Sequence, residues 1–184
     1  MTDQAPDQNM DAAKANLDLV IGWTAHADSK ATFYLTMALA ILGASLTEIP
    51  TLVKVCVHYW GAQPAWIILL LGLHIVFYGF ALFAAYMALE VVKPRIEPES
   101  NTQSWYFFQS ISRFEDVEKW REFSNGLSEA NKYQQLTDQI WNVSRVAMSK
   151  YKKAGWADFG LRVAICFGVV AVVVTLVVNQ AIGA

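Results

Sequence analysis

The chain has 184 residues, of which 55% are hydrophobic and only 16% charged, and its formal net charge is −2. Soluble domains carry about 25% charged residues, so this composition argues against an ordinary soluble domain and favours a membrane protein. The net charge itself says little, because it averages over segments that are expected to lie in different compartments.

The N-terminal part of the chain changes from polar to apolar along its length. Residues 1–10 are polar and are expected to be disordered. Apolar residues then recur at helical spacing, which predicts one helix over 11–48, cytoplasmic in its first half and membrane-spanning from Ala31 on. Pro50 is expected to stop this helix. The segment 49–63 is predicted to be an external loop with interfacial aromatic residues.

Three apolar blocks without charge occur along the chain, at 31–47, 64–89 and 163–184. Crossing the hydrocarbon layer takes about 20 helical residues at roughly 1.5 Å each. The second and third blocks reach this length and the first nearly does. We therefore predict three transmembrane helices, the second over 64–92 and the third over 161–184.

The basic residues indicate how these helices are oriented. Of the 14 Lys and Arg residues, only Lys54 lies between the first two apolar blocks. Because basic residues collect in cytoplasmic loops, the N-terminus and the region 93–160 are expected in the cytoplasm. Three spans then place the C-terminus outside.

The region 93–160 is the largest polar stretch, and its pattern is helical. Phe107, Ile111 and Phe114 share one helical face. After a break near Asn125, apolar residues recur every three or four positions, which predicts an amphipathic helix that continues into the third span as one rod of about 50 residues. The predicted fold is therefore all-α, with the first and last transmembrane helices extended into a cytoplasmic helical bundle.

Small residues mark the second and third spans. They are Gly72 and Gly79 on the second span and Ala164, Gly168, Ala171 and Thr175 on the third. Small residues let helix backbones approach closely in lipid, which supplies no hydrophobic drive between helices. Because three slender spans would pack poorly alone, we also expect a homo-oligomer surrounded by membrane lipids.

The sequence holds no catalytic motif, no cofactor motif and no metal-ligand cluster. We therefore expect a protein that is not an enzyme, has no cofactor or metal, and binds no nucleic acid. His74 lies within the second span, where it serves either packing or a proton relay.

Two polar groups lie at the predicted cytoplasmic edge of the membrane. The first is Asp28 with Lys30, directly before the first span. The second is the hydrophilic face of the long helix, and it consists of Gln139, Asn142, Arg145, Ser149, Lys150, Lys152 and Lys153. The basic residues of this face either meet anionic lipid headgroups or belong to a ligand site.

A ligand site on this face would suit a small anion. Gln139 and Asn142 offer amides that can read a planar group, and Arg145 and Lys150 offer cations that can hold a phosphate. Nearby aromatic residues either pack in the core or stack on a base. These residues are Trp105, Tyr106 and Phe108.

Two stretches carry a pattern of residues that resembles a known family. In "NLDLVIGWTAHADSKA", Asp28, Lys30 and Ala31 fill an Asp-x-Lys-Ala pattern before the first span, with Asn16 and Trp23 upstream. The second stretch combines "WYFFQSISRF" with the long helix, and its matching residues are Phe107, Phe108, Ile111, Gln139, Ile140, Trp141, Lys150 and Tyr151. Over about residues 16–180, the chain resembles the Pycsar effector transmembrane family.

The resemblance implies a function in bacterial antiphage defence. Family members reside in the inner membrane and act downstream of a cyclase that makes cyclic CMP or cyclic UMP during infection. Activation is expected to impair the membrane and to halt growth, which is abortive infection. We expect no appended nucleotide-binding domain, so either the soluble helices of this chain or a partner protein would bind the nucleotide. The residues alone leave open a constitutive homo-oligomeric scaffold or channel subunit without a nucleotide ligand.

The two polar groups also suggest how binding of an anion could be coupled to a change in the membrane-spanning helices. We expect Asp28 and Lys30 to pair with the basic face of the second rod, over 145–153, as partly desolvated ion pairs. An anion that competes for Arg145 or Lys150 would then shift the equilibrium between two states of the assembly.

Overall fold

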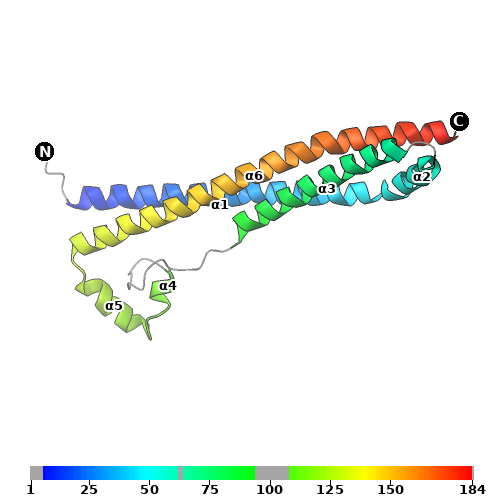
Figure 1. Cartoon of the computed structure of the whole chain (residues 1–184). Helices are drawn as coiled ribbons and strands as arrows, with labels where there is room; N and C mark the ends of the chain where they lie inside the picture. The colour runs from blue at the N-terminus through cyan, green and yellow to red at the C-terminus, as the bar shows by residue number, and fades with distance from the viewer. Residues whose placement is uncertain (1–5, 62–63, 94–107, 184) are drawn as a thin grey trace. The chain divides into compact units, whose positions relative to one another are not determined.

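The structure is a computed structural model that describes residues 6–61, 64–93 and 108–183. Over these residues the chain forms α-helices and no strands, as Figure 1 shows, so the predicted all-α class is confirmed. The chain divides into two compact units. The polar unit comprises 1–27 and 93–150, and the membrane unit comprises 28–92 and 151–184.

The first helix, α1, runs from Pro6 to Leu46 and contributes residues to both units. It begins earlier than the predicted start at residue 11. Proline is well accommodated in the first turn of a helix, because its missing N–H would have no partner within the helix there. Residues 1–5 lie outside the described part of the chain, and their predicted disorder is not tested.

The predicted loop over 49–63 contains a second helix, α2, from Ile49 to Tyr59. Pro50 lies in the first turn of α2, where proline is favourable, and α1 has already ended at Leu46. Val55 of α2 is fully buried against α3. The loop prediction is therefore corrected for residues 49–59, because the apolar side chains of this segment recur at helical spacing and find a helix surface to pack on.

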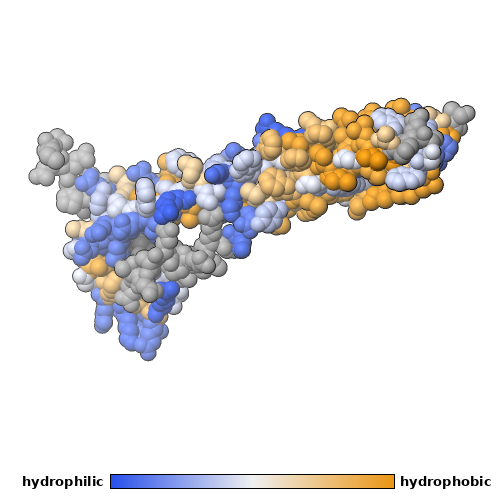
Figure 2. All heavy atoms as spheres, in the orientation of Figure 1, coloured by the Kyte–Doolittle hydropathy of each residue, from blue (hydrophilic) through white to orange (hydrophobic). Residues whose placement is uncertain are grey.

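The other long helices are α3, from Pro64 to Val92, and α6, from Glu129 to Gly183. The unbroken 55 residues of α6 confirm the prediction of a single rod. Three helices, α1, α3 and α6, are long and apolar enough to cross a membrane, so the protein is a membrane protein. Figure 2 shows hydrophobic residues gathered over α3 and the second half of α6, and hydrophilic residues over the start of α6.

Small residues fill the interior of the membrane unit. In this unit, seven buried residues of α6 recur alternately at three and four positions, and they are Ala154, Ala157, Leu161, Ala164, Gly168, Ala171 and Thr175. Gly160 is buried next to Leu161. This period of about 3.5 residues is typical of left-handed coiled-coil packing. A Cβ atom at Gly168 would lie 2.7 Å from the ring of Phe77, so α3 and α6 approach as closely as glycine allows.

The two groups of small residues that the sequence singled out behave differently. The stripe predicted on the third span is buried, as expected for helix packing within the chain. A Cβ atom added at Gly72 or Gly79 of α3 would have no atom of another element within 4 Å. The expectation that these two glycines bring helices together is therefore wrong for contacts within the described part of this chain.

The polar unit has a core of both large and small apolar side chains. Its core joins Ala13 and Leu17 of α1 to Leu136 of α6, with Ile140 and Val143 packed against them. Two shorter helices complete its described part, and they are α4, Phe108–Ile111, and α5, Val117–Gly126.

Capping residues separate the helices of the polar unit. Asp116 accepts a hydrogen bond from the Lys119 backbone N–H at 2.7 Å and so begins α5. The hydroxyl of Ser128 accepts one from Asn131 N–H at 3.2 Å before α6. The predicted break near Asn125 is thus confirmed, within two residues, by the end of α5 at Gly126.

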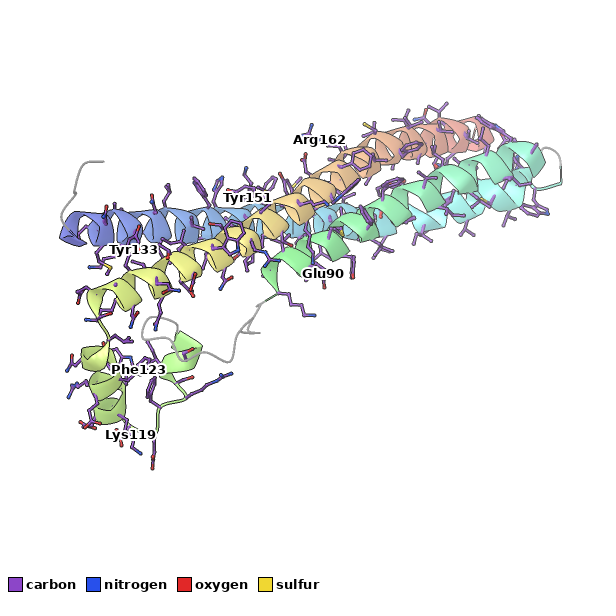
Figure 3. All side chains as sticks on the ribbon, turned by 60° about the vertical axis from the view of Figure 1, so that its left-hand side comes forward. Glu90, Lys119, Phe123, Tyr133, Tyr151 and Arg162 are labelled. Atoms are coloured by element: carbon purple, nitrogen blue, oxygen red, sulfur yellow. The ribbon has the colours of Figure 1, made fainter. Side chains whose placement is uncertain are left out.

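The predicted aromatic face is only partly described. Phe107 lies outside the described residues, and α4 is a single turn. Phe114 packs instead on Phe123 of α5, with ring centroids 5.3 Å apart. Figure 3 shows Phe123 and Lys119 on α5.

Candidate functional site

The four candidate ligand residues all lie on α6, in the part that belongs to the polar unit. Lys150 is buried, with 6% of its surface exposed. Arg145 is exposed, and Gln139 and Asn142 are half-buried. Lysine is rarely buried to this degree in proteins, so Lys150 stands out among the four.

Helix geometry shows which of these residues share a side of α6. At about 100° per residue, Gln139 and Lys150 lie within about 20° of each other around the helix axis. Arg145 lies about 140° from Lys150 on the same measure. The four residues therefore do not form one face of α6, and Arg145 is directed away from the side that carries Lys150 and Gln139.

The residues predicted to couple the ligand to the membrane lie at the start of the membrane unit. Lys30 places its ammonium 5.8 Å from the centroid of the Tyr151 ring, which is a cation–π contact between α1 and α6. Asp28 is half-buried two residues earlier on α1. The contact described for Lys30 is thus aromatic, and ion pairing of Asp28 and Lys30 with Arg145 or Lys150 stays a prediction.

A second contact at this level was not predicted. Lys153 of α6 pairs with Glu90 of α3 at 2.8 Å, and both side chains are about 30% exposed. Figure 3 shows Glu90 at the end of α3 and Tyr151 on α6. The sequence indicates that Glu90 needs a partner, because it is the one charged residue between the start of α3 and Val92.

A third pair lies further along α6. Asp158 and Arg162 are separated by 2.9 Å, one turn apart on the helix. The Arg162 side chain is 76% exposed, and arginine at the end of a span can extend its guanidinium toward the membrane surface. We refer to Lys30, Glu90, Tyr151, Lys153, Asp158 and Arg162 as the charged belt.

The charged belt ties the three long helices of the membrane unit together at one end. Lys30 joins α1 to α6, and Glu90 joins α3 to α6. Ion pairs with partial desolvation depend strongly on both partners, so losing one partner leaves an uncompensated charge. A change at this end of α6 can therefore alter how all three helices are held.

Two further candidate groups give no additional site. Trp105 and Tyr106 lie outside the described residues, and the Phe108 side chain is not described. Within the part of the chain that the structure describes, no group of His, Cys, Asp and Glu is placed to hold a metal ion.

Comparison with known proteins gives a family match over most of the chain. The family model described as "Pycsar effector protein domain" matches residues 12–178. This range includes α2 to α5 and nearly all of α1 and α6. No curated protein and no solved structure gives a significant match.

Proposed function

The chain belongs to the Pycsar effector family, and we propose that it is a membrane effector of bacterial antiphage defence that a cyclic pyrimidine nucleotide activates. The nucleotide would be cyclic CMP or cyclic UMP. Activation would impair the inner membrane and cause abortive infection. The N-terminus and the polar unit would lie in the cytoplasm, where such a messenger is made.

The observation that best supports this proposal is the continuity of two helices. Both α1 and α6 contribute to the polar unit and to the membrane unit without a break. Rigid helices that pass from one unit into the other can carry a change of state between them. The family match covers both units, so this arrangement belongs to the effector as a whole.

We propose Lys150 as the main cation for the nucleotide phosphate. It is buried, and it lies on the same side of α6 as Gln139, whose amide can read a base edge. Asn142 and Arg145 lie progressively further around the helix and would contribute at the rim of the site. Lys150 also directly precedes Tyr151, whose ring makes the cation–π contact with Lys30.

This position supports a mechanism of coupling. A phosphate that binds Lys150 acts one residue away from the cation–π contact between Lys30 and Tyr151. A ligand shifts a conformational equilibrium only by its different affinity for the two states. We propose that the nucleotide favours a state in which Asp28, Lys30 and the charged belt are rearranged and the spans are repacked in the membrane.

The proposed function is tested in cells that express the chain with or without a pyrimidine cyclase. The membrane potential, followed with a voltage-sensitive dye, should collapse only when the cyclase is active. Equal depolarisation without cyclase activity would contradict gating by a nucleotide. That result would favour a constitutive homo-oligomeric channel or scaffold.

The proposed ligand residues are tested in the same cells. Lys150→Gln should weaken the cyclase-dependent depolarisation by at least about tenfold, because one charge-assisted phosphate contact contributes about 1.5–3 kcal/mol. Arg145→Ala should have a smaller effect. Lys132→Gln is the matched control, since Lys132 also lies on α6 but pairs at 2.9 Å with Glu129, three residues earlier on the same helix. An unchanged response of correctly inserted Lys150→Gln would exclude this site.

We also propose that copies of the chain associate in the membrane. The exposed face of α3 that carries Gly72 and Gly79 supports this, because within the described chain nothing packs on these glycines. Cysteine cross-linking at Gly79→Cys should yield dimers in membranes. Leu69→Cys serves as a control for random collision, because Leu69 is exposed but lies about 80° from Gly79 around the same helix. Equal yields at both positions would contradict a specific interface.

A further inference from the structure

Two exposed aromatic residues on α3 indicate how deep each position of this helix lies in the hydrocarbon layer of the membrane. Trp66 and Tyr86 are exposed near opposite ends of this helix. They are 20 residues apart, which is about 30 Å of helix and equals the thickness of the hydrocarbon layer. Tryptophan and tyrosine favour the two edges of this layer. Phe77, about midway between them, therefore lies near the centre of the membrane.

The break between α1 and α2 lies at this central depth. A groove of about 500 Å³ is lined by residues of the break, by Phe77 of α3 and by Gly168 of α6. The first transmembrane segment is thus interrupted inside the membrane, because α2 continues to pack on α3 and α6 beyond the break. Broken helices at this depth are typical of sites where a membrane protein binds an ion or a small polar group.

Glu48 is the carboxylate of this groove. It occupies the N-cap position of α2, but its side chain makes no capping hydrogen bond. Among the described residues, neither a cation nor a hydrogen-bond donor contacts this carboxylate. An unpaired carboxylate in hydrocarbon is strongly disfavoured, so it must either bind a proton or meet a cation.

His74 provides a second polar group close to the same depth. It is 6% exposed and lies three residues from Phe77 on α3. Its Nδ1 lies 3.0 Å from the Leu70 carbonyl oxygen. Because a carbonyl can only accept, Nδ1 carries the proton, and Nε2 of the neutral ring presents a lone pair. That buried Nε2 has no hydrogen-bond partner among the described residues, and such a group calls for an explanation.

We infer that the α1–α2 break is a proton-transfer site in the middle of the membrane, with Glu48 as the proton carrier and Nε2 of His74 as a second acceptor. The protonated carboxylic acid of Glu48 is neutral and stable in lipid. When it releases its proton, a carboxylate remains. Nε2 of His74 can take up a proton to give an imidazolium, whose charge the carboxylate at similar depth then balances.

The groove suits a proton better than a metal ion. A hard metal cation takes about six oxygen ligands, whereas a proton needs one carboxylate. The hydroxyls of Ser45 and Thr47 already donate to carbonyls of α1, at 2.7 Å each. Among the described residues that line the groove, Glu48 is the one titratable group. Titratable groups elsewhere on the surrounding helices include Lys54, Cys56, His58 and Tyr59 of α2, Tyr78 of α3 and Cys166 of α6.

Tyr78 also helps to hold the break in place. Its hydroxyl donates to the carbonyl of Ser45 at 3.4 Å, and the same carbonyl accepts the Glu48 backbone N–H at 3.1 Å. Backbone groups freed inside a membrane need such partners. The break is therefore supported by α3, which also carries His74.

This inference deepens the proposed function, since proton flow through the break would dissipate the membrane potential. It depends on the proposed function only for the nucleotide trigger. Proton binding at Glu48 is a property of the resting protein and can be measured without any nucleotide.

Infrared difference spectra test the proton site directly. The whole protein in phosphatidylethanolamine–phosphatidylglycerol vesicles is titrated with pH, and the stretch of a protonated carboxylic acid in an apolar environment is followed. We expect such a band in the unsubstituted protein and its absence from Glu48→Gln. Glu122→Gln, which changes an exposed carboxylate of α5, should keep it. A spectrum in which Glu48→Gln removes no such band would overturn the inference.

Proton flux separates this inference from the nucleotide proposal. Vesicles with a pH-sensitive dye inside receive a potassium diffusion potential, with cyclic UMP or cyclic CMP on both sides. Glu48→Gln should reduce the rate of acidification at least about tenfold and His74→Gln several-fold, while Glu122→Gln leaves it unchanged.

If the nucleotide opens a leak that Glu48→Gln does not reduce, the proton site is refuted and the effector function stands. If flux depends on Glu48 but ignores nucleotide, the gating proposal fails and the site stands.

Discussion

The two units of this chain differ in the share of their buried positions that carry alanine or glycine, although α1 and α6 contribute to both. In the polar unit, Leu17 and Leu136 are buried together with branched neighbours. In the membrane unit, alanine and glycine occupy most buried positions on the same two helices and on α3. On α6, the buried apolar residues up to Lys150 are Leu136 and Ala147, whereas most buried residues from Ala154 on are alanine or glycine.

The difference follows from the solvent around each unit. In water, burying a large apolar side chain contributes about 1.5–3 kcal/mol, so leucine is a favourable core residue. In lipid this drive is absent, and close van der Waals contact between small residues holds helices together. The exposed surface shows the reverse pattern, since the membrane unit exposes large residues such as Ile68, Ile75 and Val177.

The largest expected effect on stability comes from the core of the polar unit. Leu136→Ala should lower the free energy of unfolding by about 2–5 kcal/mol, because it leaves a cavity in a fully buried position. Urea unfolding in detergent, followed by circular dichroism, measures this loss. Leu19→Ala, at an exposed position of α1, should change stability by less than about 1 kcal/mol. Equal losses at both positions would show that Leu136 is not in a packed core.

In the membrane unit the opposite change, from small to large, should be harmful. Gly168→Val should destabilise the chain by about 1–3 kcal/mol, since its Cβ alone would contact the Phe77 ring at 2.7 Å. Gly155→Val is the matched control on the same helix, because no atom lies within 4 Å of its Cβ position. Unfolding in mixed micelles with increasing dodecyl sulfate compares the two. A loss for Gly155→Val as large as that for Gly168→Val would contradict close packing of α3 on α6.

Substitutions in the charged belt should lower the free energy of unfolding by an intermediate amount. Glu90→Gln should cost about 1–2 kcal/mol, less than a fully buried pair and more than a surface pair, because it leaves Lys153 without its carboxylate. Combining it with Lys153→Met should recover part of the loss. A double-mutant cycle in the same micelle assay measures this coupling, and strictly additive losses would argue against the pair.

The smallest effect concerns the cap of α5. Asp116→Ala should cost about 1 kcal/mol and should affect only this helix, since the carboxylate accepts from the Lys119 N–H. Hydrogen exchange of the α5 amides should accelerate several-fold. Glu115→Ala, which removes only an exposed pair with Lys119, should leave exchange nearly unchanged. Faster exchange throughout α6 as well would show that the cap acts beyond its own helix.

The helices of this protein were largely predictable because their periodicity is strong. The long apolar blocks indicated three spans, and the unbroken pattern after Asn125 indicated a single rod, as α6 confirms. The helix α2 was missed because Pro50 was read as a stop for the preceding helix. In the structure this proline begins the next one, and only contacts with α3 and α6 reveal that the segment packs as a helix.

The site was less predictable, because it depends on which side of a helix each residue occupies. Spacing alone grouped Arg145 with Lys150, whereas helix geometry places them about 140° apart around α6. Glu90 and Tyr151 became partners of Lys153 and Lys30 only once three helices were packed together. The first helix was predicted to run to residue 48, whereas α1 ends at Leu46 and Glu48 lines a groove where α1 and α2 meet.

The central claim, that this chain is a nucleotide-activated membrane effector, is tested most directly with the purified protein in vesicles. Ion leakage across the vesicle membrane is recorded as cyclic CMP, cyclic UMP or, for comparison, cyclic AMP is added. We predict that a cyclic pyrimidine nucleotide starts leakage within the assay and that Lys150→Gln weakens this response at least about tenfold. Leakage that is the same with every nucleotide and with none would contradict the claim.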